Sequence, residues 1–184
     1  LHQEEKQLIM LAVENNRQAQ QQIYAKFSSK MLSVCRQYIK DIHHAEDVMI
    51  TGFMKVFTNL KNFEHKGSFE GWIRRIMVYE CIDFLRVKKN NFNHQDIDDV
   101  TVSENESVYE MEDFSVDDIQ NMIDNLPDGY KMVFNLYAIE GYKHQEIAEM
   151  LKISEGTSKS QLSHARKLLQ QQITELKKKL NGTK

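Results

Sequence analysis

The sequence predicts an all-α protein with two small helical domains joined by an acidic, flexible linker. Seven Gly and one Pro in 184 residues leave few helix breakers. Apolar residues recur at steps of three and four in both halves of the chain. Between these halves, residues 90–128 contain 12 Asp and Glu but no Lys or Arg, although the net charge of the whole chain is only −3. We therefore expect domains at residues 1–89 and 116–184, with a linker at 90–115.

Three helices should open the first domain, which we expect to be a bundle. Leu8, Leu11 and Ala12 suit the first helix. The second helix, with an interruption expected near Ser28 and Ser29, carries these apolar residues at helical spacing: Ile23, Phe27, Met31, Val34, Cys35 and Tyr38. The third carries one apolar stripe, formed by Ala45, Val48, Met49, Phe53, Val56, Phe57 and Leu60.

A loop and a fourth helix complete the first domain. The segment KNFEHKGS, residues 61–68, is predicted to be the loop, and its Ser68 can cap the next helix. That helix carries Phe69, Trp72 and Ile73 and ends in the basic run RVKK. The spacing of Phe69 and Trp72 favours packing in the core over a role as stacking platforms.

The acidic segment lacks a sustained helical period and is rich in Asn, Asp, Ser and Glu. A run of carboxylates without compensating bases is costly to compact, so we expect it to be extended and mobile. It could cover basic faces of the flanking domains by electrostatic attraction, or it could be a solvated spacer. The sequence leaves both interpretations open.

The second domain should begin with a helix that carries Val116, Ile119, Met122 and Ile123. Pro127 suits the first position of the next helix. The apolar residues of this helix are Tyr130, Val133, Phe134 and Tyr137, and Gly141 should end it.

The stretch HQEIAEMLKISEGTSKSQLSHARK, residues 144–167, has the pattern of a helix-turn-helix. Its inner face is predicted to comprise Ile147, Ala148, Leu151, Ile153, Leu162, Ala165 and Leu169, with Ser154 as N-cap. Two residues depart from the usual pattern: Lys152 stands where the turn commonly has Gly, and Ser158 where an apolar residue is usual. The outer face of the second helix carries small and polar side chains, which can contact DNA phosphates and base edges.

Two classes of protein would each explain part of these features. A stand-alone helix-turn-helix regulator would explain the second domain but not the first. His43, His44, Glu46 and Asp47 could suggest a metalloenzyme, but no distant His or Asp completes a site, and no nucleotide-binding or nucleophile motif is present. We predict no cofactor and no enzymatic activity. Cys35 and Cys81 are isolated, and no run is long enough to cross a membrane, so a cytoplasmic protein without membrane insertion is expected.

The chain resembles the extracytoplasmic-function sigma factors of the bacterial sigma-70 family over nearly its whole length. The similarity lies in NLPDGYKMVFNLYAIEGY and EIAEMLKISEGTSKSQLSHARKLL, which resemble region 4, and in HHAEDVMITGFMKVFTNL and GSFEGWIRRIMVYECIDFLRVKK, which resemble region 2. The resemblance implies a transcription initiation factor that binds core RNA polymerase, through the β′ clamp helices and the β flap, and directs it to promoter DNA. It also implies an anti-sigma factor as a partner.

The resemblance further implies a role for individual residues. Contacts with the polymerase would be made by Glu46, Asp47, Ile50, Thr51 and Met54, with Ile50 equally compatible with core packing. The −10 element would be bound by Asn62, His65, Lys66, Ser68, Arg74, Arg75, Lys88 and Lys89. Tyr79 stands where the family commonly has Asn. The −35 element would be read at base edges by Lys159, Ser160, Ser163 and His164, and held at the backbone by Thr157, Gln161 and Arg166. His164 replaces a frequent Arg, which would weaken or redirect guanine readout.

Overall fold

The computed structural model describes residues 3–91 and 114–181, and within this part of the chain the regular elements are all helices. This confirms the all-α fold class. The chain divides into two compact units, Leu1–Asn91 (unit 1) and Phe92–Lys184 (unit 2). The predictions about the acidic segment concern residues 92–113 and lie outside the described residues.

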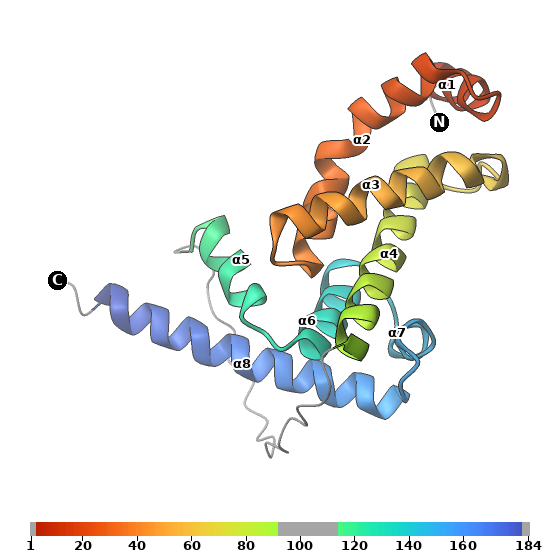
Figure 1. Ribbon diagram of the computed structural model, residues 1–184. Coiled ribbons are helices and arrows are strands. Elements are labelled where there is room, and N and C mark those ends of the chain that lie inside the picture. The colour runs from red at the N-terminus through yellow and green to blue at the C-terminus, as the bar shows by residue number, and fades with distance from the viewer. Residues whose placement is uncertain (1–2, 92–113, 182–184) are drawn as a thin grey trace. The chain divides into compact units, whose positions relative to one another are not determined.

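Unit 1 is a bundle of four α-helices with one short 3₁₀ turn (Figure 1). Its elements are α1 (Gln3–Val13), α2 (Arg17–Tyr38), α3 (Ile42–Asn59), η1 (Leu60–Asn62) and α4 (Phe69–Asn91). Helices α2, α3 and α4 pack against one another, and α1 packs on α2. Asn16 caps α2 by accepting a hydrogen bond from the Ala19 amide, and Asp41 caps α3 by accepting one from the His44 amide.

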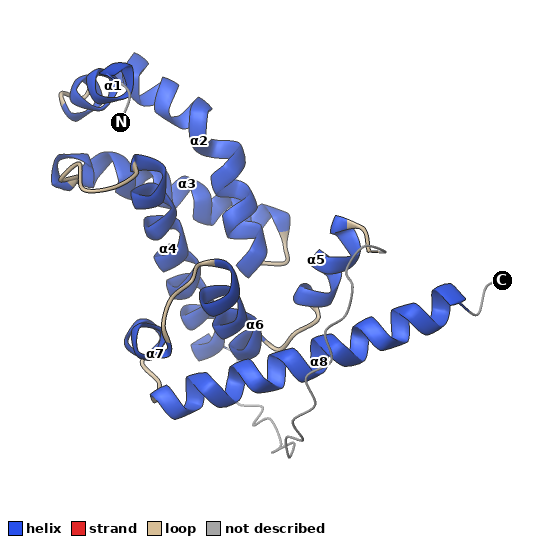
Figure 2. Cartoon of the chain, turned by 180° about the vertical axis from the view of Figure 1, so that it is seen from behind, coloured by secondary structure: helices blue, strands red, loops and turns tan. Residues whose placement is uncertain are grey.

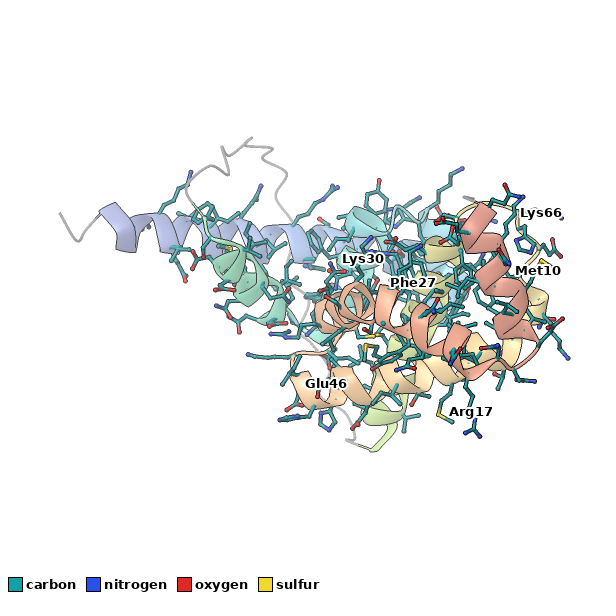
Figure 3. The ribbon with its side chains drawn as sticks, turned by 90° about the horizontal axis from the view of Figure 1, so that it is seen from above. Met10, Arg17, Phe27, Lys30, Glu46 and Lys66 are labelled. Carbon is teal, nitrogen blue, oxygen red and sulfur yellow. The ribbon has the colours of Figure 1, made fainter. Side chains whose placement is uncertain are left out.

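The core of unit 1 follows the predicted stripes of the second and third helices closely. Every apolar residue predicted for α2 is buried, and Phe27 makes an edge-to-face contact with Phe69 of α4 in the interior (Figure 3). The interruption predicted near Ser28 and Ser29 is wrong, because α2 continues to Tyr38. In α1 the buried residues are Ile9 and Ala12, whereas the predicted core residue Leu11 is 40% exposed.

Gly52 of α3 lies against the side chain of Met77 in α4. A Cβ atom placed on it would lie 2.3 Å from Sδ of Met77, whose side chain is fully buried. A side chain at this position would have to displace Met77, and core atoms are close-packed. The sequence pattern did not mark this glycine, because it lies inside a stripe of larger apolar residues.

Unit 2 is built on one long helix, α8 (Glu155–Asn181), against which α5 (Val116–Asp124), α6 (Asp128–Phe134) and α7 (His144–Leu151) pack (Figure 2). Ser115 and Asp118 form a capping box at the start of α5. Hydrogen bonds from Ser115 hold the pKa of the Asp118 carboxyl below its usual range. Pro127 is the N-cap of α6, one residue before the predicted position.

The helix predicted to run to Gly141 changes its winding on the way. After Phe134 the chain forms a π-helical segment, Asn135–Ile139. The chain then turns at Gly141, where φ is +78° and the Tyr142 amide donates to the carbonyl of Leu136 at 2.9 Å. Asn135 and Leu136 are fully buried, whereas Tyr137, one of the apolar residues named for this helix, is 37% exposed.

Lys152 ends α7 in the left-handed conformation, with φ +56° and ψ +47°. The turn therefore has a positive φ at this residue, the conformation that glycine adopts without strain, although the sequence has lysine there. A Cβ atom is unfavourable in this region. We expect Lys152→Gly to raise the free energy of unfolding of unit 2 by about 1 kcal/mol in chemical denaturation. Lys152→Ala is the control, since it removes the same charge but keeps the Cβ atom. Equal stabilisation by both variants would attribute the gain to charge instead of backbone strain.

Candidate nucleic-acid interface

Helices α7 and α8 form the predicted helix-turn-helix. The Ile153 amide donates to the carbonyl of Ala148, and Ser154 Oγ accepts from the Thr157 amide at 2.9 Å, which confirms Ser154 as the cap of α8. Ile147 and Met150 of α7 and Leu162 and Ala165 of α8 are buried in the inner face. Met150 was not predicted, and Ile153 is only partly buried.

Ser158, the residue that departs from the usual apolar pattern, lies at 0% exposure in the contact between α7 and α8. Its Oγ is 2.9 Å from Nδ1 of His144, the first residue of α7. A buried hydroxyl is costly unless it has a hydrogen-bond partner, and here the histidine supplies one. The two helices are thus joined by a polar contact at a position where apolar packing was expected.

The side chains predicted to read the −35 element all lie on the first half of α8. Lys159, Ser160 and Arg166 are exposed, whereas the others are partly buried: Thr157, Gln161, Ser163 and His164. Gln161 lies against Gly129 of α6, with Nε2 3.3 Å from where a Cβ would be. The ring of His164 stacks on Tyr130, with centroids 5.4 Å apart and an interplanar angle of 16°. His164 therefore contributes to packing of α6 on α8 as well as to the outer face.

Lys159 Nζ lies 2.7 Å from Glu155 Oε1 at i,i+4 spacing. The hydrogen bond from Lys159 and its charge hold the pKa of the Glu155 carboxyl below its ordinary value. A carboxyl with a lowered pKa favours the folded state above its ordinary pKa, and this contribution is lost as the pH falls through the folded-state pKa. Near neutral pH the pair is therefore intact.

Two aromatic side chains beside this face were missed by the sequence analysis. The Arg166 guanidinium lies over the ring of Tyr137 at 5.8 Å, and Tyr137 stacks on His144 with centroids 4.7 Å apart. The sequence pattern gives His144 no role of its own and places Tyr137 only among the apolar residues of its helix. The only indication of this contact in the sequence is that Tyr137 and His144 are seven positions apart, on either side of a predicted turn.

The loop predicted to contact the −10 element is exposed in unit 1. Asn62 ends η1, and Lys66 Nζ pairs with Glu64 at 2.7 Å. His65 has φ +57°, and its ring lies 4.8 Å from that of the buried Phe63. Ser68 accepts a hydrogen bond from the Gly71 amide, as predicted for a helix cap. The structure therefore brings Asn62, His65, Lys66 and Ser68 together on one short segment.

Helix α4 carries the remaining −10 candidates. Arg75 lies over the exposed Tyr79 at 5.8 Å, while Arg74 is partly buried. Lys88 and Lys89 belong to the last turns of α4, and their side chains are outside the described residues. Phe69 is 1% exposed and stacks on Trp72, which confirms that Phe69 packs in the core.

The polymerase-contact candidates lie along the outer side of α3, on which Glu46 is marked in Figure 3. Ile50 is 49% and Met54 65% exposed, so the core interpretation of Ile50 is wrong. Asp47 and Thr51 are exposed as well, and Thr51 Oγ1 donates to the carbonyl of Asp47 at 2.9 Å. We call Glu46, Asp47, Ile50, Thr51 and Met54 the α3 face.

His43 Nδ1 and Glu46 Oε2 are 3.7 Å apart, but in residues 3–91 and 114–181 no three His, Cys, Asp or Glu side chains gather as a metal site would require. No helix in this described part of the chain is long and apolar enough to cross a membrane.

Comparison with known proteins gives one consistent result. The family profile "Sigma-70 region 2" matches residues 23–91, and "Sigma-70, region 4" matches residues 116–169. The chain is 29% identical over 163 residues to the ECF RNA polymerase sigma factor SigW of Bacillus subtilis, covering 82% of this chain and 86% of that protein. It is 30% identical to SigE of Mycolicibacterium smegmatis, covering 69% and 51%.

Solved structures share the fold. RpoE of Bartonella quintana, in complex with the anti-sigma factor NepR, aligns with a TM-score of 0.55 at 18% identity, covering 84% of this chain and 96% of that one. CnrH in complex with the cytosolic domain of CnrY aligns with a TM-score of 0.51 at 20% identity, covering 91% and 96%.

Proposed function

We propose how the work of promoter recognition is divided within this chain, which belongs to the extracytoplasmic-function sigma factors of the sigma-70 family. The chain is a promoter-specific transcription initiation factor for RNA polymerase. Sigma factors are initiation factors, not enzymes in the usual sense. The proposal concerns which residues contact polymerase, the −10 element and the −35 element, with residues 1–89, the acidic segment at 90–115 and residues 116–184 as the functional domains.

Unit 2 binds the −35 element through the outer face of α8. The observation that carries this assignment is the group of small, polar and basic side chains, with Lys159, Ser160 and Arg166 exposed, on the first half of a helix that packs against α7 and is capped by Ser154. Such a helix can enter the major groove without a bulky barrier. The edges of the bases are contacted by Lys159, Ser160, Ser163 and His164. The DNA backbone is contacted by Thr157, Gln161 and Arg166.

We expect Lys159→Ala to change which −35 sequences are used, at a cost of about 1–3 kcal/mol at the base that Lys159 reads. Thr157→Val should weaken all promoters alike, because a phosphate contact carries no sequence information. The measurement is sequencing of transcripts made in vitro by the reconstituted holoenzyme from templates randomised at −35. If both variants lower transcription without shifting the preferred sequence, the division between base and phosphate contacts is wrong.

Unit 1 binds the −10 element through its exposed loop and the adjoining helix. Unpaired bases need polar partners, and the strand needs positive charge. Asn62, His65 and Ser68 supply polar groups on one segment, and Lys66, Arg74, Arg75, Lys88 and Lys89 supply the charge. The α3 face binds the β′ clamp helices, with Ile50 and Met54 as apolar contacts, and the second polymerase contact is that of unit 2 with the β flap.

An anti-sigma factor is the proposed regulatory partner. Both structural neighbours described above were solved with a protein partner, and one of these partners, NepR, is an anti-sigma factor. Co-purification of the full chain with core RNA polymerase tests the initiation-factor assignment directly. A stand-alone helix-turn-helix regulator would bind a duplex operator but would not co-purify with core RNA polymerase.

A further inference from the structure

Four side chains of unit 2 form a continuous series of contacts that ends at Arg166. Ser158 Oγ, fully buried, is 2.9 Å from His144 Nδ1. The His144 ring stacks on Tyr137 with centroids 4.7 Å apart and an interplanar angle of 22°. The Arg166 guanidinium lies over the Tyr137 ring at 5.8 Å. The series therefore connects the buried start of α8 with an exposed cation further along the same helix.

Tyr137 belongs to the π-helical segment. Asn135 and Leu136 are fully buried, and the next residue, Tyr137, is 37% exposed. Its ring is thus held by the fold on one side and open to solvent on another. An aromatic ring in this situation attracts a guanidinium through its quadrupole while the N–H edges of the guanidinium remain free for another acceptor.

The electrostatic setting differs between the two exposed cations on this part of α8. Lys159 is paired with the carboxylate of Glu155 at 2.7 Å. Among the described residues, Arg166 contacts a ring rather than a carboxylate, which leaves its positive charge uncompensated. An arginine so held retains both its charge and its hydrogen-bonding fork, and both suit a phosphate oxygen.

We infer that Tyr137, supported by His144, is a positioning residue that holds Arg166 in place for a DNA phosphate. The inference rests on the proposed backbone contact of Arg166. A long side chain loses rotamer entropy when it binds, and a side chain already restricted by a ring loses less. The His144–Ser158 hydrogen bond orients the imidazole on which Tyr137 stacks, so that the Tyr137 ring does not move when DNA binds.

The experiment is a double-mutant cycle in the full chain. The probe is a short fluorescent DNA duplex of mixed sequence, titrated at low KCl and followed by anisotropy, because a phosphate contact does not depend on sequence. Tyr137→Leu removes the π face but keeps an apolar side chain, and Tyr137→Phe keeps the face. We expect Tyr137→Leu to weaken binding about two- to fivefold and Tyr137→Phe to bind as the parent chain does. In an Arg166→Ala background Tyr137→Leu should have no further effect.

The outcomes separate failure of the positioning role of Tyr137 from failure of the proposed phosphate contact of Arg166. If Arg166→Ala leaves the affinity and its salt dependence unchanged, the proposed phosphate contact itself is wrong. If Arg166→Ala weakens binding but Tyr137→Leu weakens it equally with and without Arg166, Tyr137 acts through the general stability of unit 2 and the positioning role is overturned. Thermal unfolding of each variant identifies any general loss of structure.

Discussion

Charge reversal at Asp47 should weaken binding of the full chain to core RNA polymerase about tenfold or more, while its helicity stays unchanged. Asp47 is an exposed residue of the α3 face, which also carries two exposed apolar residues, Ile50 and Met54. A lysine there would present the wrong charge to any surface that complements this face, and such mismatches cost several kcal/mol. The fold should tolerate the change because no described side-chain contact of Asp47 is lost.

The control is Glu14→Lys, the same change of charge at an exposed residue between α1 and α2. Competition with a labelled parent chain for core polymerase measures both variants, and circular dichroism measures their helicity. A specific loss in Asp47→Lys alone supports the α3 face. Unchanged competition by Asp47→Lys, with normal helicity, would exclude this face as the docking surface.

Gly52→Ala should lower the free energy of unfolding of unit 1 by about 1–3 kcal/mol. The added methyl group would overlap Sδ of Met77, which is fully buried and has little room to move. The intrinsic helix propensity of alanine works in the opposite direction, by up to about 1 kcal/mol, but does not offset a clash inside a close-packed core.

Gly71→Ala is the matched control in the same unit. The nearest atom to its added Cβ would be Cβ of Ser68 at 3.7 Å, an ordinary contact, so this variant should be neutral or slightly stabilising. Urea denaturation of the full chain measures both variants. Equal effects of the two substitutions would mean that the contact of Gly52 with Met77 does not limit packing. If the contact does limit it, adding Met77→Ala should remove most of the destabilisation caused by Gly52→Ala.

The stripes of α2 and α3 could be predicted because each buries one face over several turns, so apolar spacing and burial coincide. The break predicted at Ser28 and Ser29 failed because local propensity is weaker than burial of Phe27 and Met31 on either side. The first helix was too short to define its face, and Leu11 was chosen where Ile9 is buried. The change to π winding was invisible to an analysis that assumes 3.6 residues per turn.

The candidate site was predicted in its position but not in its internal contacts. Helix-turn-helix spacing placed α8 correctly, and Lys152 and Ser158 were both marked as departures from the usual pattern. The structural effect of each of these two residues depends on the side chains that surround it in the fold, which the pattern does not give. The stacking of His164 on Tyr130 and of His144 on Tyr137 joins residues from different helices, and no periodicity within one helix indicates such pairs.

The Ser158–His144 hydrogen bond has a consequence for exchanging promoter specificity between relatives. In a chimaera that receives α8 alone, Ser158 would be buried against a foreign first helix without its imidazole partner, and an unsatisfied buried hydroxyl costs about 1–3 kcal/mol. Conversely, a foreign recognition helix with an apolar residue at this position would leave His144 facing a hydrocarbon surface. A graft that moves α7 and α8 together should therefore keep the Ser158–His144 hydrogen bond, which a graft of α8 alone loses.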